Sequence, residues 1–340
     1  MARTGKIGRQ FFEEHIASRL GAPRDDVRKG PAHGVDFGVV DVGGRAIALA
    51  TDPLSILPEL GFERAGRFAV QFVLADVAVS GLTPSHLAVS FALPPEMTDE
   101  EFAAVWNAID RECRDLGVSV VTGHTARYAG CSFPWVGHGT ALAVGDHEEI
   151  LFPDGARPGD TLLVTKGPAV ETTGLLTTLF PEKIPLPESE LATAQARLDE
   201  TDTVRDAMTV AAAGGVTAMH DATEGGLFGA FHEMAASAGV RLRVDTASIP
   251  VRPGVSATAE ALGMDPWCAG TAGTLVIAAE PNSVDAVVDA LESRGTPVGV
   301  AGRVEKGQGV VVDGEPTAPP DGDASWPVYE RLLDSATTDH

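Results

Sequence analysis

The residues with the clearest capacity for chemistry lie in one segment, His220-Asp221-Ala222-Thr223-Glu224-Gly225-Gly226. The carboxylates of Asp221 and Glu224 are the kind of ligand that Mg²⁺ prefers. Gly225 and Gly226 directly precede a helical pattern, where backbone N–H groups can approach a phosphate closely. We therefore predict a metal-bridged phosphate site, with Asp221 and Glu224 in catalytic roles and both glycines at the phosphate. The alternative is an ordinary capped turn, because Asp and Thr are common N-cap residues.

Three more Asp residues lie at or near the expected ends of elements in the N-terminal half. Asp36 precedes a strand-like run, and Asp52 follows another. Asp76 interrupts the apolar helical stretch 68–82, where a lone carboxylate is costly unless it is paired or binds a cation. We expect Asp36, Asp52 and Asp76 to join Asp221 as ligands of Mg²⁺. The alternative is that Asp36 and Asp52 are only loop and turn residues.

Other residues have types and positions that suit a nucleotide site. The candidates for phosphate binding are Gly34, Gly38, Gly123 and Lys166, and the candidate for catalysis is His124. Lys166 follows an expected strand and could reach a phosphate as a point charge, although the chain has no GxxxxGK[ST] loop. His124 follows Gly123 at the expected end of a strand. A surface Lys and a buried, hydrogen-bonded His are the alternative interpretations.

A series of motifs occurs in a familiar order: GVDFG, TDP, ADVAVSGLTP, TGHT, TKG, HDATEGGL and AGTAGTLVI. This series resembles the superfamily of aminoimidazole ribonucleotide synthetase (PurM-like), which includes selenophosphate synthetase, thiamine-monophosphate kinase and HypE-type hydrogenase maturation factors. The resemblance covers roughly residues 5–305. It is closest to the HypE-like, AIR-synthase-related proteins of archaea.

The resemblance implies a two-domain α/β (α+β) PurM-like fold, with an N-terminal domain that dimerises through strands and a C-terminal α+β domain. It implies ATP and Mg²⁺ as cofactors, and Lys6 in a segment that folds over ATP. The implied reaction is phosphorylation of a substrate oxygen, followed by transfer, dehydration or ring closure. The substrate is a small molecule or a maturation partner protein. A small-molecule kinase similar to thiamine-monophosphate kinase and a non-catalytic nucleotide-binding scaffold remain alternatives.

The sequence departs from the family pattern in three places. Ala75 stands where Asn often precedes the Asp, and His124 stands where several members have an acidic residue. HypE-type carbamoyl dehydratases end in a reactive Cys, whereas the last residues here are 335–340, SATTDH. We therefore expect no thiol-bound intermediate.

The composition excludes several classes of function. The chain has 340 residues, 48 acidic against 25 basic, and a formal net charge of −23. Such a charge disfavours nucleic-acid and anionic membrane partners, and the Arg-over-Lys bias resembles that of salt-adapted, halophilic proteins. Three scattered Cys residues fit a reducing cytoplasm. No signal peptide and no apolar run of about 18 residues is visible, so we expect a cytoplasmic protein.

Hydrophobic periodicity predicts alternating helices and strands. Helices are expected over residues 9–20, 68–82, 98–116, 202–213, 226–238 and 284–294, and strands over residues 46–50, 86–93, 118–121, 135–144, 160–165, 240–245, 273–279 and 297–304. The Pro- and Gly-rich segment 151–159 is the expected linker. We therefore expect an N-terminal domain over residues 1–150, a C-terminal domain over 158–306 and a loosely ordered tail over 307–340.

Overall fold

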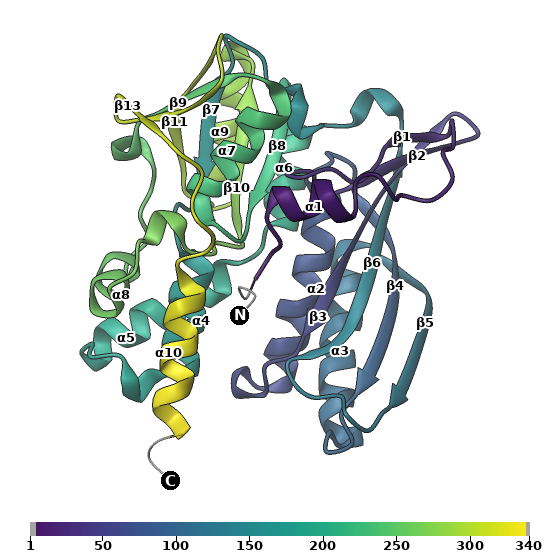
Figure 1. Cartoon of the computed structure of the whole chain (residues 1–340), viewed down its shortest axis with the longest axis vertical. Coiled ribbons are helices and arrows are strands. Elements are labelled where there is room, and N and C mark those ends of the chain that lie inside the picture. Colours follow the sequence, from purple (N-terminus) through teal and green to yellow (C-terminus); the bar gives the residue numbers. More distant parts are fainter. Residues whose placement is uncertain (1–4, 338–340) are drawn as a thin grey trace. The chain divides into compact units, whose positions relative to one another are not determined.

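The computed structural model describes the backbone of residues 5–337 and the side chains of residues 5–334 (Figure 1). The chain divides into two compact units. Of the described residues, unit 1 comprises 5–21, 32–35 and 151–337, and unit 2 comprises 22–31 and 36–150. The two units part between residues 150 and 151, and two N-terminal segments group with the C-terminal part of the chain.

Unit 2 is built on a six-stranded mixed sheet of order β1-β2-β3-β6-β4-β5. Its strands are β1 (Val27–Lys29), β2 (Gly38–Val42), β3 (Arg45–Ser55), β4 (Pro84–Leu93), β5 (Ser119–Arg127) and β6 (Trp135–Gly145). Only β4 and β5 pair in parallel; all other neighbours are antiparallel. The strands expected over 86–93 and 135–144 are confirmed as β4 and β6.

Two helices, α2 (Phe62–Ala78) and α3 (Asp99–Leu116), complete unit 2. The predicted capping box is present: Thr98 accepts a hydrogen bond from the Glu101 backbone, and the Glu101 side chain accepts one from the Thr98 backbone. The helices cross closely at Gly66, where an added Cβ would lie 2.6 Å from the Val105 carbonyl oxygen. A larger residue at Gly66 would push the helices apart, so this position requires glycine.

The edge strand β5 is unusual because, among the described residues, most side chains on both of its faces are exposed. Seven successive residues from Ser119 to Thr125 are exposed. Val120 and Val121 remain 40% and 55% accessible to solvent. The prediction that a strand ends at Thr122-Gly123-His124 is wrong, because β5 continues to Arg127. An exposed strand lacks the apolar alternation from which its length could have been judged.

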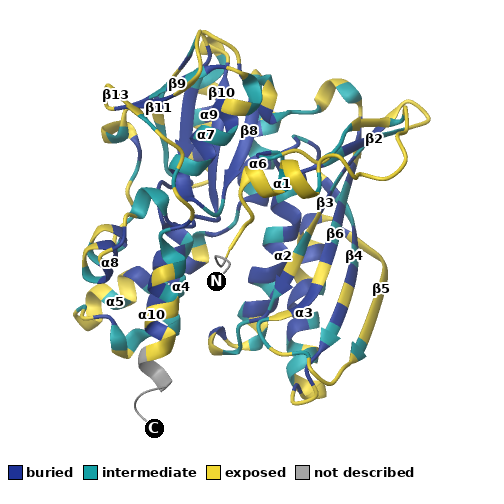
Figure 2. Cartoon of the chain, in the orientation of Figure 1, coloured by how far each residue is buried: buried dark blue, intermediate teal, exposed yellow. Residues whose placement is uncertain are grey.

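Unit 1 contains a seven-stranded sheet of order β13-β12-β9-β11-β7-β10-β8. Its strands are β7 (Thr161–Thr165), β8 (Val216–Ala222), β9 (Arg241–Val244), β10 (Thr274–Ala279), β11 (Val298–Glu305), β12 (Gly309–Val312) and β13 (Glu315–Thr317). Every residue of β10 is buried (Figure 2). Both faces of the sheet are therefore covered at its centre.

Helices α6 (Val204–Ala213), α7 (Gly226–Ala238) and α9 (Val284–Ser293) accompany this sheet. Phe231 and Met234 of α7 are fully buried in one core cluster with Leu162 and Val276 of the strands. This packing follows from the apolar stripe that the sequence places on one face of α7. It fixes α7 against β8, the strand that carries His220 and Asp221.

A second, smaller core includes residues of α4 (Val170–Leu179), α8 (Val255–Leu262) and the C-terminal helix α10 (Ser325–Thr337), and α5 (Glu188–Gln195) packs beside α4 and α8. Val328 and Leu332 of α10 are buried in it. The expectation of a loosely ordered tail after residue 306 is thus wrong, since β12 pairs with β9 and α10 packs into a core. The composition of 307–327 is typical of loops, but the short valine run Val310–Val312 provides the buried strand.

Two other predictions differ from the structure in extent. Helix α1 covers only Arg9–His15, and none of its residues is buried. Strand β3 continues beyond the expected end at Ala50 and includes Asp52 and Pro53. Strand β2 ends opposite Leu49, so the later part of β3 pairs only with β6, where a residue without an N–H is tolerated. Within residues 5–337, no helix is long and apolar enough to cross a membrane.

Candidate functional site

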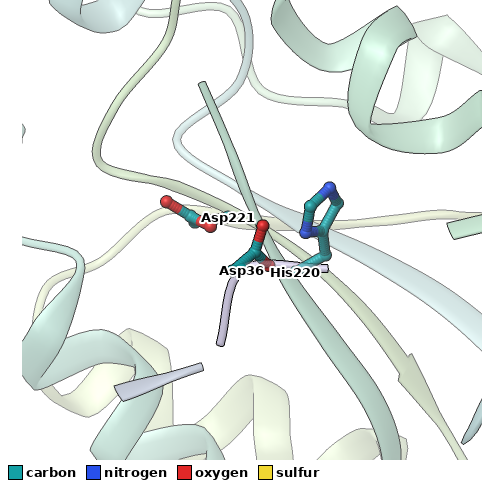
Figure 3. A group of neighbouring side chains, drawn as sticks. All are labelled: Asp36, His220 and Asp221. Carbon is teal, nitrogen blue, oxygen red and sulfur yellow. The ribbon is translucent and has the colours of Figure 1, made fainter. Parts of the chain in front are cut away.

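His220 and Asp221 lie near the end of β8, just before the glycine turn that opens α7 (Figure 3). Their exposed fractions are 1% and 4%. Each offers a potential ligand atom, and the two atoms lie within 4.8 Å of each other. Two potential ligand atoms therefore lie close together here, and the predicted metal-bridged phosphate site stays a prediction.

Glu233 of α7 holds the imidazole of His220 in place. The Nε2 atom of His220 lies 3.0 Å from a carboxylate oxygen of Glu233. Burial alone would raise the pKa of the Glu233 carboxyl, but the hydrogen bond and charge of His220, with the charges of Lys6 and His33, lower it to about 2. Glu233 is therefore ionised at neutral pH and favours a proton on Nε2 of His220. The sequence analysis did not identify Glu233; its position on the inner face of α7, facing a strand-end His, was the available signal.

The turn before α7 needs both of its glycines. Gly225 and Gly226 have φ angles of 85° and 63°, in the left-handed region that other residues avoid. A Cβ on Gly226 would lie 2.6 Å from the carbonyl oxygens of Trp267 and Ala269. The Gly225 N–H donates to Asp323 at 2.8 Å. In this structure the Gly225 N–H, which we predicted would face a phosphate, therefore donates its hydrogen bond to the Asp323 carboxylate.

Glu224 binds the N-terminal segment. The backbone N–H of Lys6 donates to the Glu224 carboxylate at 2.6 Å. A Cβ on Gly5 would lie 2.7 Å from that carboxylate and 2.8 Å from the Trp326 indole nitrogen. The N-terminal segment therefore lies between the α7 turn and the start of α10, which brings two of the predicted site residues, Lys6 and Glu224, together.

A group of carboxylates that the sequence analysis missed lies near the same turn. Glu171, in the first turn of α4, accepts a hydrogen bond from the Ala272 backbone at 3.0 Å. A Cβ on Gly270 would lie 3.4 Å from Asp323 and 3.5 Å from Glu171. Burial, helped by the charges of Asp323 and Glu224, raises the pKa of Glu171 to about 7, despite that hydrogen bond. A carboxyl group with this pKa can give or take a proton at neutral pH.

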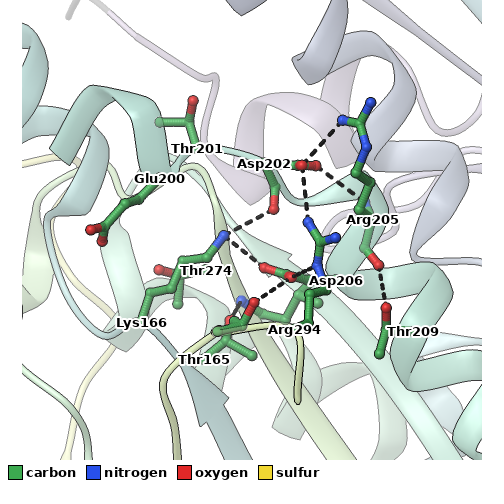
Figure 4. Close-up of polar contacts among 12 residues, drawn as sticks. Thr165, Lys166, Glu200, Thr201, Asp202, Arg205, Asp206, Thr209, Thr274 and Arg294 are labelled. Carbon is green, nitrogen blue, oxygen red and sulfur yellow. Dashed lines mark hydrogen bonds and ion pairs between the residues drawn. The ribbon is translucent and has the colours of Figure 1, made fainter. Parts of the chain in front are cut away.

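The structure gives Lys166 a different role from the predicted phosphate contact. Its ammonium group lies 2.7 Å from Asp206, and both side chains are almost fully buried (Figure 4). It also donates to the Asp202 carbonyl at 2.9 Å, while Arg294 pairs with both Asp202 and Asp206. Losing one partner of such a buried pair costs about 3–5 kcal/mol. Lys166 therefore stabilises unit 1 from within.

The predicted metal ligands of unit 2 occupy three elements. Asp36 lies in the loop before β2, Asp52 in β3 and Asp76 in α2, and all three are partly buried. Among the described residues, neither Asp52 nor Asp76 belongs to a group of three or more closely spaced ligand side chains. Their metal-binding role stays a prediction.

The remaining residues that we predicted for phosphate binding or catalysis lie in different parts of the two units. Gly34 packs on Glu233, where an added Cβ would lie 3.0 Å from the Glu233 Cβ, and Gly38 opens β2. Gly123 allows close pairing with β4, since a Cβ there would lie 2.6 Å from the Val89 carbonyl oxygen. His124 lies inside β5, exposed, 3.1 Å from the Tyr128 hydroxyl. Their roles in nucleotide binding or catalysis also stay predictions.

Comparison with known sequences gives one family for both parts of the chain. Residues 34–142 match the N-terminal domain, and residues 157–315 the C-terminal domain, of AIR synthase-related proteins. The carbamoyl dehydratase HypE of Escherichia coli is 30% identical over 312 residues, which cover 89% of this chain and 88% of that protein. HypE of Cupriavidus necator is 30% identical over 75% of this chain and 71% of its own.

Solved structures share the same fold. A crystal structure of Escherichia coli HypE, described as a hydrogenase maturation protein, superposes with a TM-score of 0.68 at 28% identity, over 81% of this chain and 86% of that one. Thiamine-monophosphate kinase from Stenotrophomonas maltophilia gives a TM-score of 0.67 at 20% identity, over 86% and 93%. The expected two-domain PurM-like fold is thereby confirmed.

Proposed function

Since the chain belongs to the AIR synthase-related family together with the HypE carbamoyl dehydratases, we propose that it is an enzyme that uses ATP and Mg²⁺ to phosphorylate a substrate oxygen. The observation that carries this proposal is the match to HypE across both domains, 88% of that protein's length. The acceptor is a small molecule or a maturation partner protein. Phosphorylation turns an amide or carboxylate oxygen into a leaving group, which permits dehydration or cyclisation.

The residues near the α7 turn suit this chemistry. Mg²⁺ takes oxygen ligands, and Asp221 offers a buried carboxylate at a strand end. We propose Asp36, Asp52, Asp76 and Asp221 as its ligands, with Glu224 and His124 as groups acting on substrate. Bound Mg²⁺ would neutralise charge that develops on the phosphates. Gly225 and Gly226 would face the phosphates, which requires the Asp323 carboxylate to release the Gly225 N–H.

Two alternatives have support of their own. A small-molecule kinase fits the fold likeness to thiamine-monophosphate kinase, which extends over 93% of that chain. A non-catalytic nucleotide-binding scaffold fits the replacement of the usual Asn by Ala75. The three proposals differ in their products. A small-molecule kinase releases ADP and a phosphorylated compound, and an enzyme that dehydrates or cyclises its substrate releases ADP, phosphate and the altered compound. A scaffold shows no turnover.

Release of ADP tests the proposal. The full chain is incubated with ATP and Mg²⁺, with and without candidate amide, carboxylate and alcohol acceptors, and ADP is quantified. We expect acceptor-dependent ADP that is lost in Asp221→Asn and retained in Asp285→Asn, a matched change at an exposed position of α9. Nucleotide binding without turnover by any acceptor would favour the scaffold, and absence of both binding and turnover would contradict the proposal.

We also propose a homodimer formed through unit 2. The exposed valines of β5 and the 60% exposed Trp135 of β6 leave an apolar surface and an open strand edge, and such edges are usually covered in stable proteins. Light scattering at low micromolar concentration should give twice the chain mass of 35.2 kDa. Val121→Lys should reduce this to one chain mass, and a monomeric wild type would contradict the proposal.

The acidic composition leads us to propose a salt-requiring protein. A net charge of −23 repels itself more strongly as the Debye length grows from about 3 Å at 1 M salt to about 30 Å at 0.01 M. Circular dichroism should therefore show loss of structure on desalting. An unchanged spectrum between these salt levels would contradict salt adaptation.

A further inference from the structure

Strands β9 and β11, which are neighbours in the sheet of unit 1 (Figure 1), carry a group of arginines. Leu242 of β9 and Val304 of β11 belong to the core cluster that includes residues of α7. Because successive side chains of a strand point to opposite faces, Arg241, Arg243 and Arg303 lie on the face turned away from that core. We name these three residues the arginine face. A positive surface is unexpected on a chain whose formal net charge is −23.

Two of these arginines are held directly opposite each other. Arg303 of β11 pairs with Arg243 of β9, and the next residue on this face of β11, Glu305, pairs with Arg241. Like charges directly opposite each other on a sheet are destabilising. One carboxylate oxygen of Glu305 accepts a hydrogen bond from Nε of Arg243 at 3.0 Å and from Nε of Arg303 at 2.8 Å. A single carboxylate therefore balances two guanidinium groups, and one positive charge is left over.

The contacts with Glu305 leave the outer nitrogen atoms of both guanidinium groups available. Within the part of the chain that the structure describes, Arg243 and Arg303 make their ion pairs through Nε, and no contact uses Nη1 or Nη2 of either residue. Their side chains are 39% and 65% exposed. An anionic group can therefore reach both guanidinium groups from solvent while Glu305 keeps them in position.

Other charged residues border the arginine face. Asp245 follows β9 and Asp313 follows β12. Asp313 accepts hydrogen bonds from the backbone and the hydroxyl of Thr246 at 2.9 and 2.6 Å, and Asp245 accepts two from the residues that follow it. Both carboxylates thus bind the turn after β9, whereas the exposed Lys306, next to Glu305, adds a fourth positive charge.

The spacing of the arginines indicates what kind of anion fits. Arg241 and Arg243 are two residues apart on one strand, which separates their Cα atoms by about 6.6 Å, and β11 lies about 4.8 Å to the side. An extended peptide with an acidic residue at every second position repeats at the same interval. The planar guanidinium fork also matches the geometry of a carboxylate. We propose that the arginine face binds an extended acidic segment of a partner protein. This inference goes beyond the proposed function and does not depend on it.

The test measures fluorescence anisotropy of a labelled octapeptide of alternating aspartate and threonine, mixed with the full chain without nucleotide. At 0.15 M salt the Debye length is about 8 Å, so the repulsion from distant acidic residues is largely screened while direct contacts remain. We expect binding of this peptide and no binding of its asparagine–threonine counterpart. Arg243→Gln combined with Arg303→Gln should weaken binding on the order of tenfold, as loss of two exposed ion pairs can. Arg114→Gln, at an exposed arginine paired with Asp110 in unit 2, is the matched control and should bind like wild type.

A charge-retaining variant separates direct contact from long-range attraction. Arg243→Lys combined with Arg303→Lys keeps both charges but removes the guanidinium forks, so it should weaken binding about threefold or more. This variant also tests the idea if the glutamine variant does not fold. Carbodiimide coupling then locates the peptide, since it joins a peptide carboxylate to a neighbouring lysine amine. Mass spectrometry should find the adduct on Lys306, one of five lysines in the chain.

Several outcomes would overturn the inference: no binding of the acidic peptide, equal binding of the neutral peptide, wild-type affinity in the glutamine or the lysine variant, or coupling confined to lysines other than Lys306. Equal affinity for inorganic phosphate and for the peptide would show a simple anion site and would also overturn it. Because the assay contains no ATP, failure of ADP release would contradict the proposed function alone, and failure of peptide binding would contradict this inference alone.

Discussion

Glu171 and Glu233 are both partly buried glutamates of unit 1, yet they differ in the direction of their pKa shifts. Burial raises the pKa of Glu171 to about 7, where the neighbouring charges of Asp323 and Glu224 add to the effect. At Glu233 the same burial is outweighed by His220, Lys6 and His33, and the pKa falls to about 2. Burial raises the pKa of both carboxyl groups, and only the cationic and hydrogen-bonding neighbours of Glu233 reverse the direction of the shift.

The difference separates two kinds of chemistry within one unit. Glu233 stays ionised and can orient His220 at any physiological pH. Glu171 exchanges a proton near neutrality, as a general acid or base must. Glu224 lies close enough to influence Glu171 and also binds the Lys6 backbone, so it links the two environments.

One of the largest expected effects on the free energy of unfolding is that of removing the Glu233 carboxylate. Glu233→Gln should lower the free energy of unfolding at pH 6 by on the order of 3 kcal/mol, because it removes a carboxylate whose pKa lies well below its unfolded value. That stabilisation is present above about pH 4.5 and is lost as pH falls toward 2. Urea unfolding at pH 6 and pH 3 should therefore show a gap that narrows at pH 3. The exposed Glu292→Gln is the control, and equal stability of Glu233→Gln and wild type at pH 6 would contradict the assignment.

Glu171→Gln should change the free energy of unfolding in the opposite direction. The folded-state pKa of Glu171 lies above its unfolded value, so its ionisation costs stability as pH rises from about 4.5 to 7. The variant should be more stable than wild type at pH 8 by about 3 kcal/mol and equal to it at pH 4. Unfolding curves at both pH values measure this. A loss of stability at pH 8 would show that the ionised carboxylate is favoured by its surroundings.

A smaller effect should appear at Cys268, which shares the neighbour Asp323 with Glu171. Burial, the charge and hydrogen bond of Asp265, and the charge of Asp323 raise the pKa of the Cys268 thiol to about 12. Cys268 should therefore react very slowly with iodoacetamide at pH 8. Asp323→Asn should speed its alkylation by no more than about threefold, which corresponds to half a pKa unit.

Cys113 provides the internal reference for this measurement. Burial and the charges of Glu112 and Asp110 raise the pKa of its thiol to about 11, and Asp323 is not among the causes. Peptide mapping by mass spectrometry should show its slow alkylation unchanged in Asp323→Asn. Rapid alkylation of Cys268 in the wild type would contradict the acidic environment.

The sequence was most informative where pattern and burial coincide. The capping box at Thr98, the helix 226–238 and strands such as 86–93 follow from local signals and were predicted correctly. The extent of β5 was not predictable, because its exposed residues carry no periodicity. The tail was misjudged because loop-like composition hid the short strand Val310–Val312 and helix α10.

At the site, the sequence identified residues close together in the chain but not their distant partners. His220, Asp221 and the glycine turn were found because they are contiguous. Glu233, Glu171 and Asp323 meet this segment only through folding, so no spacing revealed them. Lys166 was misassigned, because its position after a strand says nothing of the buried Asp206 that pairs with it.

The central claim, that this chain binds ATP through a divalent metal, is tested most directly by calorimetric titration of ATP into the full chain. We predict binding in Mg²⁺ that disappears in excess EDTA. Asp52→Asn, Asp76→Asn and Asp221→Asn should each weaken it by about 1–3 kcal/mol, as expected for loss of one charged ligand. Asp285→Asn should bind like wild type. Equal ATP affinity with and without metal, or wild-type affinity in all three ligand variants, would contradict the account.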